Sequence, residues 1–205
     1  MKYTLIVLIL YLLTSFSHLS GQKLYVWCPS EQTIVPRNGF LKNDTIDLVF
    51  FDGRVLNEKS RIECTSENVI NHLQNFLYDC YPSAVFNSLS TNSYFDEPNT
   101  NRITIKIGIS AYHAAFGADI KLGIGSVGGD FSFMVFPKGK WNGLTAYFIK
   151  IYDYRCSREI QKSKEISKIT SKSNIWGYKT AIDCLAKTYS DANQEMLFFI
   201  DNTLM

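Results

Sequence analysis

The chain has 205 residues, which is room for one domain or two very small ones. Its 21 basic residues nearly balance 19 acidic ones, so the sequence lacks the strong positive field that marks most nucleic-acid-binding proteins. Hydrophobic residues make up 46% of the chain, and Gly and Pro fill only 12 and 5 positions, which excludes collagen-like and largely disordered proteins.

Residues 1–21 have the layout of a secretory signal peptide. A positive Lys2 precedes the apolar run Leu5–Leu13, and a stretch of small residues leads up to Gly21. The apolar run is about nine residues long, whereas a membrane-spanning helix needs about 20. We therefore expect cleavage after Gly21 rather than a permanent anchor. The mature protein would then be soluble, in the periplasm or outside the cell, with no transmembrane helix.

Five cysteines follow this leader: Cys28, Cys64, Cys80, Cys156 and Cys184. In an oxidising compartment one or two disulfides are expected, and the odd count leaves at least one thiol outside an intramolecular pair. The pairing cannot be chosen from the sequence. No C-x-x-C occurs, so neither a zinc ribbon nor a thioredoxin-type redox site is indicated.

The first elements of the mature chain are an extended arm and a buried strand. Residues 22–43 contain two prolines and few regular patterns, so we interpret them as an extended N-terminal arm. The apolar run Ile46–Phe51 predicts a buried strand. Asp52-Gly53 follows it and is a typical hairpin-turn pair. A helix is predicted over 66–81, with Thr65 or Ser66 as its cap and one apolar face.

The second half of the chain predicts three strands and a long helix. Isoleucines alternate with polar residues in the strand 103–113, which implies one buried face and one wet or partly covered face. Phe131–Phe136 and Leu144–Tyr154 are further β-prone runs, separated from the first strand by the glycine-rich stretch 117–130. The apolar stripe over 175–200 repeats every three or four residues and predicts a helix lying across a sheet.

The connector between the last strand and the last helix is rich in Lys, Arg and Ser. We interpret residues 155–174 as a solvated loop or a short exposed helix. The alternative is a segment that contacts anionic head groups or glycans through its clustered positive charges.

No group of residues predicts a catalytic, cofactor or metal site. Residues 123–128 match G-x-G-x-x-G, but a β-prone run follows them where a dinucleotide site requires a helix. His72 and His113 lie in no metal-ligand spacing, and we interpret both as structural. No cofactor and no bound metal are expected. His113, Phe116 and Trp141 are candidate contacts to a ligand or a partner.

The order strand 46–51, helix 66–81, strands 103–113 and 144–154, and helix 175–200 resembles small periplasmic modules of the TolB amino-terminal and transport-auxiliary lipoprotein type. The resemblance covers roughly residues 44–200 and implies an α/β (α+β) fold, with a small mixed or antiparallel sheet and two amphipathic helices on one face. We expect a single domain over 44–205. It also implies a non-catalytic adaptor, so it transfers no active-site residues. A lipid-attachment Cys is missing and the stretch 117–130 is unusually long for this type.

The preferred hypothesis is a non-enzymatic adaptor or binding protein of a bacterial cell envelope. A protein partner would be engaged at a sheet edge by strand addition, or on an open sheet face. The alternative is a secreted small-ligand or glycan-binding protein with an aromatic pocket near residues 112–141. A secreted hydrolase is less favoured, because it requires His113 or His72 within hydrogen-bond reach of a Ser, a Cys or an acid.

Overall fold

The computed structural model describes residues 23–30, 32–56, 58–117, 121–122, 133–134, 139–155 and 159–204. The leader, the G-x-G-x-x-G segment, most of the run Phe131–Phe136, and Cys156 lie outside these residues. The elements in chain order are β1 (Leu24–Val26), β2 (Thr45–Asp52), β3 (Arg61–Ile62), α2 (Ser66–Cys80), β4 (Val85–Ser88), the 3-10 helix η1 (Thr91–Tyr94), β5 (Ile103–Phe116), β6 (Lys121–Leu122), β7 (Phe133–Met134), β8 (Lys140–Asp153), β9 (Ile160–Ser173) and α3 (Tyr178–Leu204).

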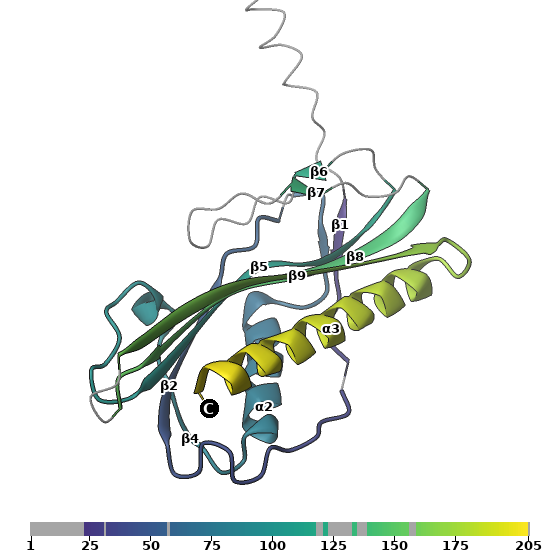
Figure 1. Ribbon diagram of the computed structural model, residues 1–205. Helices are drawn as coiled ribbons and strands as arrows, with labels where there is room; N and C mark the ends of the chain where they lie inside the picture. Colours follow the sequence, from purple (N-terminus) through teal and green to yellow (C-terminus); the bar gives the residue numbers. More distant parts are fainter. Residues whose placement is uncertain are drawn as a thin grey trace, which may run out of the picture.

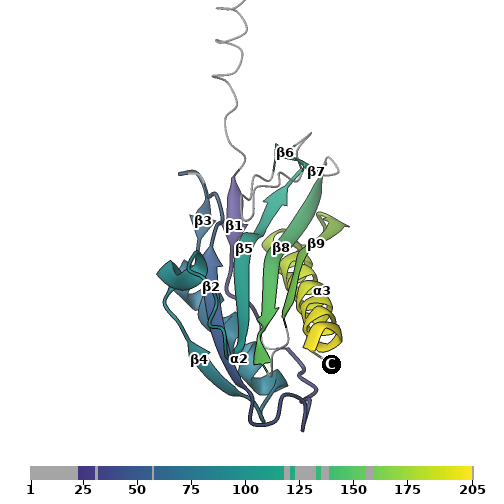
Figure 2. The same ribbon diagram turned by 60° about the vertical axis from the view of Figure 1, so that its left-hand side comes forward.

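Seven of the described strands form one mixed sheet with β5 near its centre. β8 pairs antiparallel with β5 along nearly its whole length. The other edge of β5 is shared, because β2 pairs parallel with its first half and β1 antiparallel with its last residues. β9 pairs with β8 and β4 pairs with β2, and Figure 2 shows β4, β2, β5, β8 and β9 side by side in this order.

Both long helices pack on one face of this sheet, as Figure 1 shows. The main core cluster joins the isoleucines of β5 to apolar residues of α2 and α3. The side chains of α2 in this cluster recur at helical spacing: Val69, Leu73, Phe76, Leu77 and Cys80. The predicted α/β (α+β) arrangement of a mixed sheet with two helices on one face is therefore confirmed.

The sequence also predicted the start of α2. Thr65 is the N-cap, and its hydroxyl accepts a hydrogen bond from the backbone N–H of Asn68 at 3.2 Å. Glu67 places a negative charge in the first turn, where the helix dipole favours it.

Gly143 of β8 is where α3 comes closest to the sheet. A Cβ atom at this position would lie 2.6 Å from the backbone carbonyl carbon of Cys184 and 2.7 Å from the backbone nitrogen of Leu185. Contacts this short do not occur in folded proteins, so only glycine allows the helix to lie this near the strand.

A β-bulge in β5 changes which side chains face the helices. The pairing with β8 shifts between Ile109 and Ala111. Beyond the shift, Tyr112 faces the helices, and its ring centroid lies 5.5 Å from that of Tyr189 in α3. Its neighbour Ala111 therefore points to the opposite face, because side chains alternate along a strand.

The opposite face of the sheet is also covered over the first half of β5. Lys106 is buried there, and its ammonium group donates hydrogen bonds to the carbonyl oxygens of Tyr94, at 2.9 Å, and of Asp96. The segment that contains η1 thus lies over a face that alternation alone predicts to be wet or only partly covered. Burial lowers the pKa of Lys106, and the nearby charge of Lys150 acts in the same direction.

Two predicted loop features are wrong. The expected loop or short helix at 155–174 contains β9, a strand of 14 residues. Asp52-Gly53 does not form a hairpin, since β2 pairs only with parallel strands and the Gly53 N–H continues the ladder to the carbonyl of Ile109. The Asp52 carboxylate instead accepts hydrogen bonds from the backbone N–H and the guanidinium of Arg54.

The expected extended arm at 22–43 contributes β1 to the sheet, and a disulfide fixes its start. Cys28 lies two residues after β1 and is bonded to Cys64, which directly precedes the cap of α2. The prediction of at least one disulfide is confirmed. Cys80 and Cys184 are buried free thiols, as the apolar stripe predicts for Cys80.

Candidate functional site

Two of the three predicted contact residues lie together. Phe116 and Trp141 are cross-strand partners on β5 and β8, with ring centroids 5.2 Å apart. Trp141 is only 5% exposed, and its ring also contacts Tyr25 and Tyr178. An aromatic cluster therefore closes this end of the core on the helix-covered side.

His113 lies on the other face of the sheet. It pairs with Leu144 of β8, which packs with Ala111 and Ala146 away from the main core cluster. The bulge before Ala111 separates His113 from the side of Ile109, where simple alternation predicts it. The three residues do not form one site, and their role in contacting a ligand or partner stays a prediction.

His113 should make the stability of the protein depend on pH. Burial lowers its pKa from 6.5 to about 4, and the charge of Arg54 acts in the same direction. The unfolded chain binds a proton at His113 more readily than the folded chain, so protonation favours unfolding. The protein therefore has its full stability above pH 6.5 and loses part of it as the pH falls towards about 4.

We expect the free energy of unfolding of the wild type to fall by about 1–2 kcal/mol more than that of His113→Gln across this window, a value reduced for the partial exposure of the side chain. Urea unfolding at a series of pH values measures the difference. His72→Gln, on the exposed side of α2, is the matched control and should follow the wild type. Parallel curves for the wild type and His113→Gln would contradict the prediction.

The described residues give no hydrolase partner to either histidine. Among the described residues, no hydrogen bond joins His72 or His113 to a Ser, a Cys or a carboxylate. The same residues contain no group of His, Cys, Asp and Glu that could hold a metal ion. The predicted aromatic pocket near 112–141 falls largely outside the part of the chain that the structure describes.

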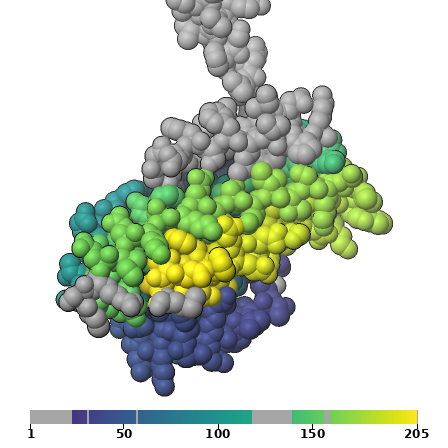
Figure 3. All heavy atoms as spheres, in the orientation of Figure 1, coloured from purple at the N-terminus to yellow at the C-terminus, as the bar shows by residue number. Residues whose placement is uncertain are grey.

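The long strand β9 forms one edge of the sheet. It pairs with β8 from Ile160 to Ser173 and with no other strand of the described residues. Figure 3 shows the side chains of this region as a green band directly beside those of α3, in yellow. Among its side chains only Ile166 is buried, so nearly the whole strand contacts solvent.

Lysines line the side of β9 that faces α3. Lys162, Lys164, Lys168 and Lys172 occupy positions of the same parity along the strand. Lys164 and Lys168 form ion pairs with Glu195 of α3, the first at 2.8 Å. Hydrogen bonds from these two lysines hold the pKa of Glu195 below its usual range. Lys162 and Lys172 have no carboxylate partner among the described residues.

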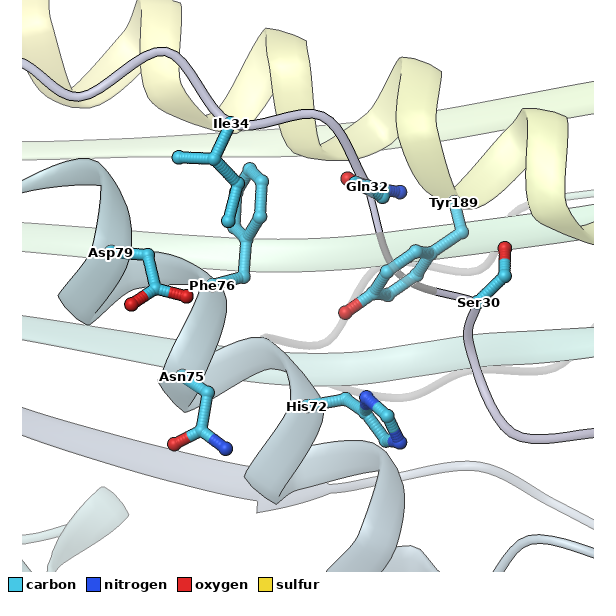
Figure 4. A pocket seen from close by; sticks show the side chains of 8 residues that line it. All are labelled: Ser30, Gln32, Ile34, His72, Asn75, Phe76, Asp79 and Tyr189. Carbon is cyan, nitrogen blue, oxygen red and sulfur yellow. The ribbon is translucent and has the colours of Figure 1, made fainter.

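A groove lies between α2, α3 and the segment that follows the disulfide (Figure 4). Its volume is about 400 Å³. Phe76 and Tyr189 supply aromatic surface, and the exposed side chains of His72, Asn75 and Asp79 line it along α2.

Polar contacts hold the frame of this groove. The Asn193 amide donates a hydrogen bond to Gln32 at 3.3 Å and accepts one from the Tyr147 hydroxyl at 3.0 Å. Further along the chain, Arg37 forms an ion pair with Asp201 at 2.7 Å. These contacts fix the segment after the disulfide against α3 on both sides of the groove.

Sequence reasoning missed both surfaces. For β9 a signal existed, because the lysines between 162 and 172 are two or four residues apart, which places them on one face of a strand. For the groove there was none, since its walls come from three segments far apart in the chain whose packing no local pattern encodes.

The comparisons with known proteins give no family. No family model and no curated protein matches this chain. Solved structures with a similar arrangement include protein XCC0632 from Xanthomonas campestris, described by the family model DUF330, with 6% identity, a TM-score of 0.47 and coverage of 83% of this chain and 91% of that one.

Two further structures are similar in the same way. The hypothetical protein CT253 from Chlamydia trachomatis has 8% identity and a TM-score of 0.49, with coverage of 79% of this chain and 98% of that one. Lipoprotein GNA1162 from Neisseria meningitidis has 9% identity and a TM-score of 0.36, with coverage of 73% and 99%. These values are too low to transfer a function, and the TolB or transport-auxiliary type stays a prediction. Within the described residues, no helix is long and apolar enough to cross a bilayer.

Proposed function

We propose that this protein is an exported, non-enzymatic adaptor of a bacterial cell envelope, and that it holds a partner protein by strand addition at β9. The observation that carries the proposal is the length of this edge: 14 residues of β9 pair on one side with β8 and on the other with no described strand. An extended partner segment gains main-chain hydrogen bonds at such an edge, and the alternating side chains supply selectivity.

The charge of β9 selects the kind of partner. Lysines on an edge strand oppose pairing between two copies of the same chain. The same lysines attract an acidic segment, and Lys162 and Lys172 form no ion pair among the described residues, unlike Lys164 and Lys168. The partner is therefore a protein with an acidic extended stretch.

An apolar anchor lies just beyond the end of this strand. Ile175 and Trp176 follow Ser173 and are 72% and 73% exposed. A partner strand that runs along β9 meets these side chains where the strand ends. Exposed aromatic residues of this kind often dominate the binding energy of protein interfaces.

Site-specific photo-crosslinking in the producing cells tests the proposal. A benzophenone side chain at Ser163, which is exposed on β9, should give one discrete adduct with an envelope protein. Trp176→Ala and the charge reversal Lys162→Glu with Lys172→Glu should each lower the adduct yield by about tenfold, as expected for the loss of an anchor or of two charge contacts.

Phe198→Ala is the matched control, because Phe198 is 65% exposed on α3 but lies at the opposite end of the helix from Trp176. This variant should keep the full yield. An adduct that survives both β9-directed changes, or one that forms equally from a benzophenone at Asn71 on α2, would reject strand addition at β9.

A further inference from the structure

The groove between α2 and α3 contains an unmatched polar atom. Tyr189 is 3% exposed, and its hydroxyl donates no hydrogen bond to a described residue, although the nearby Asn193 amide acts against burial and lowers its pKa. A buried hydroxyl in this state destabilises a protein by about 1–3 kcal/mol. Burial also raises the pKa of Tyr189 to about 12, so the hydroxyl keeps its proton and can donate at neutral pH.

The hydroxyl points into the groove. Figure 4 shows Tyr189 reaching from α3 towards α2, with its oxygen between Phe76 and His72. Phe76 and Ile34 lie on one side of it, with Asp79 beyond them, and Asn75 and His72 lie along α2 below it. A group that fills this space can satisfy the hydroxyl and contact an aromatic wall at once.

The lining selects against two ligand classes. No Lys or Arg lines the groove, and Asp79 contributes a carboxylate without an ion-pair partner among the described residues, so an anion is disfavoured. A purely apolar ligand would leave the Tyr189 hydroxyl and the polar groups of α2 unmatched.

A sugar fits the remaining chemistry. Imidazole, amide and carboxylate groups such as those of His72, Asn75 and Asp79 bind hydroxyl groups, and an aromatic ring packs against the apolar face of a pyranose. An acetamido substituent offers a carbonyl that can accept from the Tyr189 hydroxyl and a methyl group that suits the apolar side chains of Phe76 and Ile34. The volume of about 400 Å³ lies within the usual range for small-molecule sites.

We propose that this groove binds an N-acetylhexosamine unit of a neutral glycan, with the Tyr189 hydroxyl donating to the acetamido carbonyl. The contacts of Gln32 and Arg37 with α3 fix the segment beside the groove. Because the Tyr189 hydroxyl is buried, a neighbouring side chain must shift for the acetamido carbonyl to reach it. The site is separate from β9, so it stands independently of the proposed strand addition.

Titration of the purified protein with N,N′-diacetylchitobiose, followed by NMR or calorimetry, tests this site. We expect a Kd of about 1 mM, with shifts confined to the groove, which is typical of a small ligand in an open site. Cellobiose, which carries hydroxyls in place of the acetamido groups, should bind about tenfold more weakly because it lacks the carbonyl that pairs with Tyr189. The anionic sugar 3′-sialyllactose should not bind.

Tyr189→Phe separates this role from a structural one. Removing the unmatched hydroxyl should leave the melting temperature of the free protein unchanged or higher, yet lower the affinity for diacetylchitobiose by about tenfold. Asn71→Ala, an exposed change on α2 outside the groove, should alter neither. The proposal is overturned if cellobiose binds as well as diacetylchitobiose, if sialyllactose binds, if no sugar binds at about 10 mM, or if Tyr189→Phe keeps the wild-type affinity.

Discussion

Replacing Gly143 by Ala should lower the free energy of unfolding by about 3 kcal/mol, the upper end of the usual range for overpacking. The added methyl carbon would lie 2.6–2.7 Å from main-chain atoms of Cys184 and Leu185, and a helix backbone cannot move aside as a flexible side chain can. α3 would have to lift away from β8 and reduce its contacts with the core. Urea or thermal unfolding of the two proteins measures the loss.

Gly39→Ala is the matched control for this change. Gly39 has a φ of 81°, but an added methyl group there would meet no atom within 4 Å, so only the backbone conformation opposes the substitution. It should lower the free energy of unfolding by about 1 kcal/mol. A Gly143→Ala variant at least as stable as Gly39→Ala would mean that α3 does not lie this close to β8.

Replacing both Cys28 and Cys64 by Ser should lower the free energy of unfolding by about 3–4 kcal/mol, the value expected from the entropy of a loop of this length. The bond closes a separation of 36 residues that contains β2 and β3. Without it, the unfolded chain gains conformational freedom, and the segment after β1 loses its attachment to the start of α2.

A reducing agent provides the control for the disulfide. It should shift the unfolding curve of the wild type to that of the double variant and leave the double variant unchanged. The free thiols of Cys80 and Cys184 should not form a new bond in the double variant, because burial raises the pKa of both and keeps them protonated. A double variant that stays sensitive to reduction would contradict Cys28–Cys64 as the stabilising pair.

Elements with one strongly apolar face could be predicted from the sequence. The isoleucines of β5 and the apolar stripe of α2 have periods that only one type of element satisfies, and the structure places both in the main core cluster. The stripe predicted over 175–200 is right only in its later part, where Leu185, Tyr189, Ala192 and Met196 enter the cluster. Its first members, Ile175, Tyr178 and Ile182, are exposed, because α3 begins at Tyr178 and turns a different face towards the sheet. Thr65 also marked the start of α2, because capping depends on residues close in the chain. The predicted fold class rested on these elements.

β9 was missed because an edge strand needs few apolar residues. Its single buried side chain, Ile166, gives no two-residue alternation of apolar residues, and its lysines bind Glu195 or solvent instead of entering a core. The bulge near Ser110 was missed for a different reason. It depends on how β5 pairs with β8, so the side on which His113 lies follows from tertiary pairing and not from the local pattern.

The position of α3 in the chain order has a consequence for biosynthesis. Every strand of the central sheet is synthesised before α3, yet α3 supplies much of the apolar cover for β5 and β8. A nascent chain that has emerged only as far as β9 therefore exposes a broad apolar surface to solvent. We therefore expect productive folding to wait for the last helix, since apolar surface exposed before then favours aggregation.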